Sequence, residues 1–203
     1  MRKLLLVATF AFLSSCAFTQ TDINNINIAV GKSMHGTGDL NGIAVSLAYE
    51  HELAKRFSFG SALTTTINYG KDSWVGSVNA FHYTTAGIQL NPFGQFHIIA
   101  NRDQKLSFGL GGLLRFQTTS LPSAYGYYDE PNRFPEPFYA FRYYDKTNTV
   151  SPGYTMSLTF RNRIASKYFL GITAGFQNDT HGDAITSISL LFERVLPRFK
   201  TKN

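Results

Sequence analysis

Hydrophobic and polar side chains alternate with a period of two along most of the chain, in segments that turn residues separate. From Tyr154 to Phe160 every second side chain is large and apolar, and the residues between them are Thr, Ser and Thr. Such alternation predicts β-strands with two unlike faces. Eight segments share the pattern, and we expect strands at about 26–33, 43–50, 57–69, 81–90, 106–117, 154–163, 168–177 and 187–193.

The connections between these segments favour an up-and-down barrel, in which long exterior loops alternate with short periplasmic turns. The exterior connections are expected at about 34–41, 70–80, 118–152 and 178–183, and the periplasmic ones at about 51–56, 91–105 and 164–167. Residues 91–105 are long for a periplasmic turn. We predict a turn with one helical or amphipathic piece there, because a ninth strand would break the even strand count.

The two faces of the strands distinguish a membrane barrel from a soluble barrel of the lipocalin type. A soluble barrel turns its apolar face inward and carries many charges outside, whereas here the second face is mostly Gly, Ser, Thr and Ala. Aromatic residues also gather at strand ends, as in the girdles of membrane barrels. One level holds Tyr69, Phe116, Tyr154 and Phe176, and the other Tyr49, Phe57, Phe108, Phe160, Tyr168 and Phe192. We therefore predict an all-β, eight-stranded antiparallel up-and-down transmembrane β-barrel.

The first residues have the order of an export signal, with Arg2 and Lys3 before an apolar run that is too short to cross a bilayer as a helix. We expect a signal at 1–19, a barrel at 20–196 and a basic periplasmic tail at 197–203. Cys16 follows a sequence resembling a lipoprotein cleavage box and is a candidate for lipidation; ordinary cleavage after it is the alternative. As it is the only cysteine, no internal disulfide can form.

The charge distribution argues against nucleic-acid binding. The chain has a net charge of +6, but the signal and the tail carry most of the excess, so the body is nearly neutral and shows no concentrated basic face. The His and Asp residues have no spacing that is diagnostic of a metal site. We therefore expect no metal and no cofactor.

A few charged residues fall on the inward-facing side of the predicted strands, four of them toward the periplasmic end and Arg115 near the exterior end. We predict that they form a salt-bridged network that closes the lumen, because eight strands enclose little free space. A solvated pore lined by the same side chains is the alternative. The residues are Glu50, Arg115, Arg161, Arg163 and Glu193.

The expected loop from about 121 to 149 is rich in aromatic residues. Long loops carry function, and Tyr-rich surfaces bind partners at low entropic cost. We predict a binding surface for a partner protein or cell-surface component; a loop that packs on itself and caps the barrel is the alternative. The aromatic residues are Tyr125, Tyr127, Tyr128, Phe134, Phe138, Tyr139, Phe141, Tyr143 and Tyr144.

In its strand pattern, from about residue 24 to 196, the chain resembles the small outer-membrane proteins of the OmpX, OmpA-barrel and OmpW type. The segment Ala17-Phe18-Thr19-Gln20 resembles the signal ends of Bacteroidota barrels. The resemblance implies an outer-membrane location and contact with outer-membrane lipid, but it implies no particular activity.

A lipid-modifying enzyme is the second hypothesis and a narrow channel the third. Lipid A deacylases resemble this fold and use a His, a Ser and a Glu on the outer wall. Here His82 is followed by Thr84 where that pattern has Ser, and no acid is placed to orient the His. Other polar residues expected near the exterior rim are His35, His181, Asp39, Asp179 and Asp183. We therefore expect a barrel that is not an enzyme.

Overall fold

The structure is a computed structural model that describes residues 23–36, 40–72, 81–128 and 138–197; for 71–72, 81–82, 123–128 and 138–143 it describes the backbone alone. The described chain forms eight strands and no helix long and apolar enough to cross a membrane. The strands are β1 (Ile23–His35), β2 (Leu40–Ala54), β3 (Phe57–Asp72), β4 (Phe81–Ala100), β5 (Gln104–Tyr128), β6 (Phe138–Ala165), β7 (Tyr168–Asp179) and β8 (Ala184–Val195).

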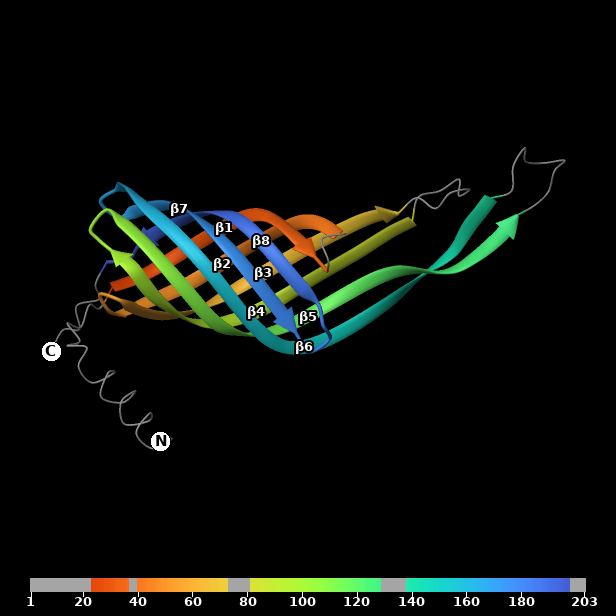
Figure 1. Cartoon of the computed structure of the whole chain (residues 1–203), viewed down its shortest axis with the longest axis horizontal. Helices are drawn as coiled ribbons and strands as arrows, with labels where there is room; N and C mark the ends of the chain where they lie inside the picture. The colour runs from red at the N-terminus through yellow and green to blue at the C-terminus, as the bar shows by residue number, and fades with distance from the viewer. Residues whose placement is uncertain (1–22, 37–39, 73–80, 129–137, 198–203) are drawn as a thin grey trace, which may run out of the picture.

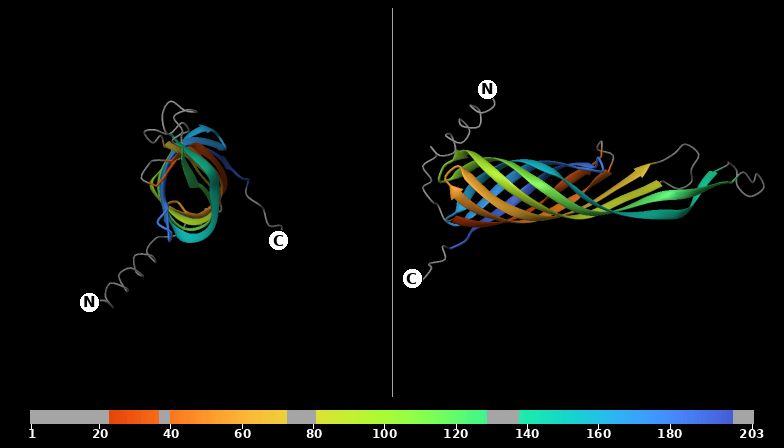
Figure 2. Two further views of the ribbon diagram at one scale, coloured as in Figure 1. Left: turned by 90° about the vertical axis from the view of Figure 1, so that its right-hand side faces the viewer. Right: turned by 90° about the horizontal axis from the view of Figure 1, so that it is seen from below.

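Each strand pairs antiparallel with the next one, and β8 pairs with β1, so the sheet closes into a barrel (Figures 1 and 2). Ile28, for example, lies opposite Leu47 of β2 and Phe192 of β8. Closure satisfies the backbone hydrogen bonds of every strand in the ring, which a lipid environment requires. The predicted eight-stranded up-and-down topology is confirmed.

The two faces of the wall differ as the alternation predicts, with polar side chains inside and apolar ones outside. In β1, Asn25 and Asn27 are 0% and 4% exposed, whereas Ile28 and Val30 are 49% and 50% exposed. Outward aromatic rings also pack in pairs, such as Tyr168 on Phe192 at 5.5 Å between centroids. An outer surface of large apolar side chains is stable in hydrocarbon and not in water, so the wall faces lipid.

One end of the barrel, where β1 begins and β8 ends, is called the terminal end, and the opposite end the loop end. At the terminal end the connections are short. β4 continues to Ala100 and β5 begins at Gln104, so the prediction of a turn with a helical piece at 91–105 was wrong. Proline has no N–H to donate to a ladder. Pro92 is nevertheless accommodated in β4, because it pairs only with Ser61 of β3 and the ladder with β5 skips Asn91 and Pro92.

At the loop end, β5 and β6 extend far beyond their neighbours (Figure 1). β4 pairs with β5 only as far as Ser120, and β7 pairs with β6 only from Gly153. β5 and β6 nevertheless remain paired from Leu121 opposite Asp145 to Tyr128 opposite Phe138. We call residues 121–128 and 138–145 the ribbon. The expected irregular loop at 118–152 is therefore largely a two-stranded sheet.

Candidate functional site

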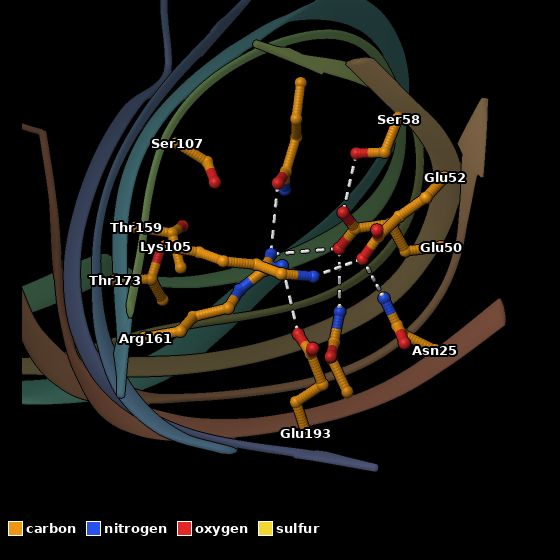
Figure 3. A network of polar contacts seen from close by, with 12 residues as sticks. Asn25, Glu50, Glu52, Ser58, Lys105, Ser107, Thr159, Arg161, Thr173 and Glu193 are labelled. Carbon is orange, nitrogen blue, oxygen red and sulfur yellow. Dashed lines mark hydrogen bonds and ion pairs between the residues drawn. The ribbon is translucent and has the colours of Figure 1, made fainter. Parts of the chain in front are cut away.

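The lumen near the terminal end contains a group of charged side chains centred on Arg161, which we call the terminal cluster. The Arg161 guanidinium lies between carboxylates from two other strands (Figure 3). Its Nη2 atom lies 2.9 Å from Glu50 Oε2, and its Nη1 atom lies 3.0 Å from Glu193 Oε2. All three side chains are 1% exposed or less. Each buried charge thus has an opposite charge beside it, which such burial requires.

Neutral groups complete the surroundings of Glu50 and Arg161. Ser58 Oγ donates to Glu50 Oε1 at 2.6 Å, and Asn27 Nδ2 donates to Glu50 Oε2 at 3.2 Å. Arg161 Nη2 also donates to Gln95 Oε1 at 3.0 Å. Hydrogen bonds to ionised groups are stronger than neutral ones, and these contacts fix the Glu50 carboxylate in one orientation.

A second layer of the terminal cluster involves Glu52 and His97. Lys105 Nζ forms an ion pair with Glu52 Oε1, which also accepts a hydrogen bond from Asn25 Nδ2 at 2.9 Å. His97 Nδ1 lies 2.7 Å from Ser107 Oγ, while its Nε2 atom lies 4.0 Å from Glu50 Oε1. The cluster therefore draws side chains from β1 through β6 and from β8 into one group that crosses the lumen.

A separate group, the loop-end cluster, is centred on Arg115. Arg115 Nη1 lies 3.0 Å from Asp179 Oδ2, and Arg115 Nε donates to Gln89 Oε1 at 3.0 Å. Asp179 Oδ2 also accepts from Ser151 Oγ at 2.7 Å, and its Oδ1 accepts from the backbone N–H of His181 and Asp183 at 3.0 and 3.1 Å. This carboxylate therefore binds the arginine and holds the β7–β8 turn at the same time.

The loop-end cluster continues to the rim of the barrel. Gln117 Nε2 donates to Asp183 Oδ2 at 2.7 Å, and His35 Nε2 lies 3.7 Å from Asp183 Oδ1. The side chain of Asp183 is 31% exposed, whereas those of Arg115 and Asp179 are 0% and 1% exposed. The cluster is thus buried on its inner side and reaches solvent on its outer side.

Between the two clusters the lumen holds a cavity of about 160 Å³. Small side chains such as Ala44, Ser46 and Thr64 line its wall, and Gln89 and Arg161 from the two clusters are among its boundaries. A space of this size holds about five water molecules. The interior is therefore a small compartment with a mixed polar and apolar lining between two layers of charged side chains.

The five lumen residues expected from the sequence do not form one network. Glu50, Arg161 and Glu193 meet in the terminal cluster, but Arg115 belongs to the loop-end cluster. Arg163 lies at the terminal rim, where its Nε atom is 3.8 Å from Asp103 Oδ1 and its guanidinium lies over the ring of Phe169. Placing Arg115 and Arg163 in a single network with the other three was wrong, because the residues differ in height along the barrel.

Sequence reasoning also missed residues that belong to the clusters. Three of them lie in segments expected to be turns, so their alternation was not followed: Glu52, His97 and Lys105. Asp179 and Asp183 were expected near the exterior rim, but not as lumen partners of Arg115 and Gln117. Extending the period of two through 91–105 would have placed His97 and Lys105 on the inward face.

The residues considered for catalysis do not assemble into a nucleophile–base pair among the described side chains. His35 faces Asp183, and His181 contacts Asp179 through its backbone. Thr84 faces outward, while the His82 side chain and Asp39 lie outside the description. No group of His, Cys, Asp and Glu suited to a metal occurs in the described parts of the chain.

Of the nine aromatic residues, Tyr144 alone has a described side chain, which is 45% exposed. Phe134 lies outside the described residues, as do the export signal, Cys16 and the last residues of the tail. The backbone of the ribbon carries the other seven: Tyr125, Tyr127, Tyr128, Phe138, Tyr139, Phe141 and Tyr143.

No protein-family model matches the chain, and no curated protein matches it. Solved structures of outer-membrane β-barrels do match its fold. Ail of Yersinia pestis, in complex with the heparin analogue sucrose octasulfate, matches with a TM-score of 0.54 and 10% identity over 87% of this chain and 100% of Ail. OprG from Pseudomonas aeruginosa matches with a TM-score of 0.52 and 6% identity over 87% of this chain and 96% of OprG. Neisserial surface protein A matches with a TM-score of 0.50 and 9% identity over 86% of this chain and 97% of that protein.

These likenesses concern the fold, which is that of small transmembrane β-barrels of bacterial outer membranes. The apolar outer wall independently requires a bilayer around the strands. The protein therefore has the fold of a transmembrane β-barrel, the fold that these outer-membrane proteins share.

Proposed function

We propose that the protein is a membrane-anchored interaction barrel, in which the closed wall holds the ribbon outside the membrane for contact with a partner protein or cell-surface component. The observation that carries the proposal is the continued pairing of β5 with β6 after both have left their other neighbours. It supports a surface role because a ribbon of this length adds nothing to the closure of the barrel.

The composition of the ribbon supports contact with a partner. A two-stranded sheet is marginally stable by itself in water, since neither face packs against a third element. Its sequence is nonetheless dense in Tyr and Phe. Exposed aromatic side chains provide large, rigid contact areas, so a partner that covers them would also stabilise the ribbon.

The open edges of β5 and β6 differ, both in the ribbon and in residues 146–150 of β6 that lead into it. The carbonyl of Pro152 accepts a hydrogen bond from the Thr180 N–H, so it points toward β7. The N–H and C=O groups of successive residues point to alternate sides of a strand. Every second residue before Pro152 therefore directs these groups to the same side, where β7 is no longer present: Val150, Asn148, Lys146 and Tyr144. On the opposite edge Pro122 lacks an N–H and two irregularities follow it. Only the β6 edge therefore has the regular groups that an added strand needs.

The charged lumen favours an anchoring role for the barrel and argues against an open pore. The terminal cluster and the loop-end cluster occupy different heights, and the space between them is small. Open channels need a continuous aqueous path, which two ionic layers oppose. His97 and Ser107 do contact each other, but both are 1% exposed or less inside the terminal cluster, where a substrate does not reach them. We therefore propose that the barrel is not an enzyme.

A deletion tests the role of the ribbon. Residues 123–143 are replaced by Asn-Gly, which joins the cross-strand partners Pro122 and Tyr144 through a two-residue turn. We expect this variant to insert as a barrel but to lose the partners that intact protein retains from outer-membrane extracts. Sulfated glycans belong in the same assay, since the similar fold of Ail was solved with a heparin analogue. Equal retention by both proteins would refute the proposal.

A proline substitution tests the edge. In Lys146→Pro the lost N–H faces the open side, so the β5–β6 ladder stays intact. We expect Lys146→Pro to weaken partner retention, while the matched control Lys146→Ala, which removes the charge alone, retains the partner. If both variants bind as the wild type does, the partner contacts the ribbon by its faces and not by this edge.

A further inference from the structure

Lys32 occupies an unusual position on the lipid-facing side of β1. Inward residues Ala29 and Ser33 are buried, so the alternation turns Val30 and Lys32 outward, and Lys32 is exposed. Its cross-strand partners are Ile43 of β2 and Ile188 of β8, each 60% exposed. The Lys32 side chain therefore leaves the backbone among apolar side chains, three residues before β1 ends.

Basic residues are scarce on the outer wall. Within the closed part of the ring, the described Lys and Arg side chains that face outward are Lys32, toward the loop end, and Arg194, toward the terminal end. The exposed Lys146 lies on β6 beyond its last pair with β7. A charge on this surface is unfavourable in hydrocarbon unless its head reaches a polar or ionic partner at the membrane interface. The position of Lys32 near the loop end brings such an interface within reach.

The wall beside Lys32 is hollowed. A shallow groove of about 450 Å³ is lined by Lys32, Asn41 and Tyr69 as polar groups and by Val30 and Ile43 as apolar ones. Asn41 lies directly opposite Tyr69 across the β2–β3 ladder, and it lies diagonal to Lys32 across the β1–β2 ladder. The diagonal spacing, about 7–8 Å between backbones, is within the reach of a lysine side chain. Three hydrogen-bond donors thus lie around one groove with an apolar wall.

We propose that this groove binds an outer-leaflet lipid whose head group carries phosphate. The Lys32 ammonium, the Asn41 amide and the Tyr69 hydroxyl donate to phosphate oxygens, and Val30 and Ile43 contact the beginning of an acyl chain. The chemistry of the groove selects this occupant: a positive charge and neutral donors lie at the interface level, and an apolar surface continues below them. A soluble anion would leave the apolar part of the groove without a partner. The site is independent of the ribbon.

Native mass spectrometry of the full barrel in detergent tests the site. The probes are diphosphorylated lipid A and the same lipid after removal of its phosphates. We expect the wild type to retain the phosphorylated lipid in preference, and Lys32→Met to bind it about five-fold more weakly, as the loss of one interfacial basic contact implies. Lys32→Arg should restore binding, because it restores the charge.

Arg194→Met is the matched control, since it removes the outward basic residue at the opposite end, and it should bind the phosphorylated lipid as the wild type does. Resistance of each variant to unfolding in detergent establishes that the barrel is intact before binding is compared. Equal binding of the two lipid probes, or equal binding by wild type and Lys32→Met, would overturn the proposal. An equal loss in Arg194→Met would also overturn it, because the effect would then reflect overall charge and not this groove.

Discussion

The terminal cluster and the loop-end cluster each neutralise a buried arginine in the lumen, but they do so with different partners. In the terminal cluster, Arg161 has two carboxylates beside it, and Glu50 is separated from it by 111 residues of sequence. In the loop-end cluster, Arg115 has one carboxylate in direct contact and an amide, and that carboxylate also holds a turn through backbone N–H groups. The first cluster therefore joins opposite walls of the barrel, and the second fixes one connection to the wall.

The two arginines therefore differ in how much each one stabilises the folded barrel. Glu50 and Glu193 are fully buried and depend on Arg161 for an opposite charge. Asp179 retains the Ser151 hydroxyl and two backbone donors when Arg115 is absent. Removing one partner of a buried ion pair is harmful chiefly through the charge left behind, so the loss should be larger in the terminal cluster.

The largest effect is expected for Arg161→Met. This change leaves two carboxylates in the lumen without their cation and should lower the free energy of unfolding by about 3–5 kcal/mol. Urea unfolding of the folded barrel in lipid vesicles, followed by circular dichroism, measures it. The triple variant Glu50→Gln, Arg161→Met and Glu193→Gln removes all three charges and should recover most of the loss. If Arg161→Met alone were as stable as the wild type, the two carboxylates would not require the charge of Arg161 for their burial.

A smaller effect is expected for Arg115→Met, about 1–3 kcal/mol, because Asp179 keeps its other hydrogen bonds. The same urea titration measures it. Proteolysis should in addition cut the β7–β8 turn faster, since the arginine no longer holds Asp179 in place. If Arg115→Met proved more destabilising than Arg161→Met, the ranking of the two clusters would have to be reversed.

The smallest effect is expected for Arg163→Met. Its partner Asp103 is 72% exposed, and exposed ion pairs contribute about 0–1 kcal/mol. Any loss should come mainly from the contact with the Phe169 ring and should hardly depend on salt. A large, salt-dependent loss would place Arg163 inside the terminal cluster after all.

Much of the fold could be predicted from the sequence because side-chain parity in a strand is a local property. The alternation at Tyr154 to Phe160 needs no knowledge of the neighbouring strands, and eight such segments suffice for the barrel. The prediction failed where turn-forming residues occur inside strands. Residues 91–105 were assigned to a turn to keep the strand count even, and 118–152 to a loop, yet strands continue through both. Their prolines Pro92 and Pro122 lie where a ladder partner is missing.

The candidate site was predicted less completely than the fold. Parity and position in the strand indicate which side chains face the lumen and toward which end, but not which of them meet, because strand tilt and stagger set the contacts across the whole ring. Glu50 and Glu193 are brought near each other by the pairing of β1 with both β2 and β8, and Arg161 reaches them across the lumen from β6. Arg115 shares their face, yet its partner Asp179 comes from the end of β7, which was expected to be a loop.

The central claim is that the apolar face of the wall contacts lipid while the polar face encloses the lumen. Adjacent positions on β7 test it directly, since Ile172 is 51% exposed on the outside and Thr173 contacts Thr159 inside. Single-cysteine variants at these positions, in a Cys16→Ser background, carry a fluorescent label in vesicles that contain brominated acyl chains. We expect strong quenching at 172 and little at 173. Quenching at 173 with none at 172, or no quenching at either position, would contradict it.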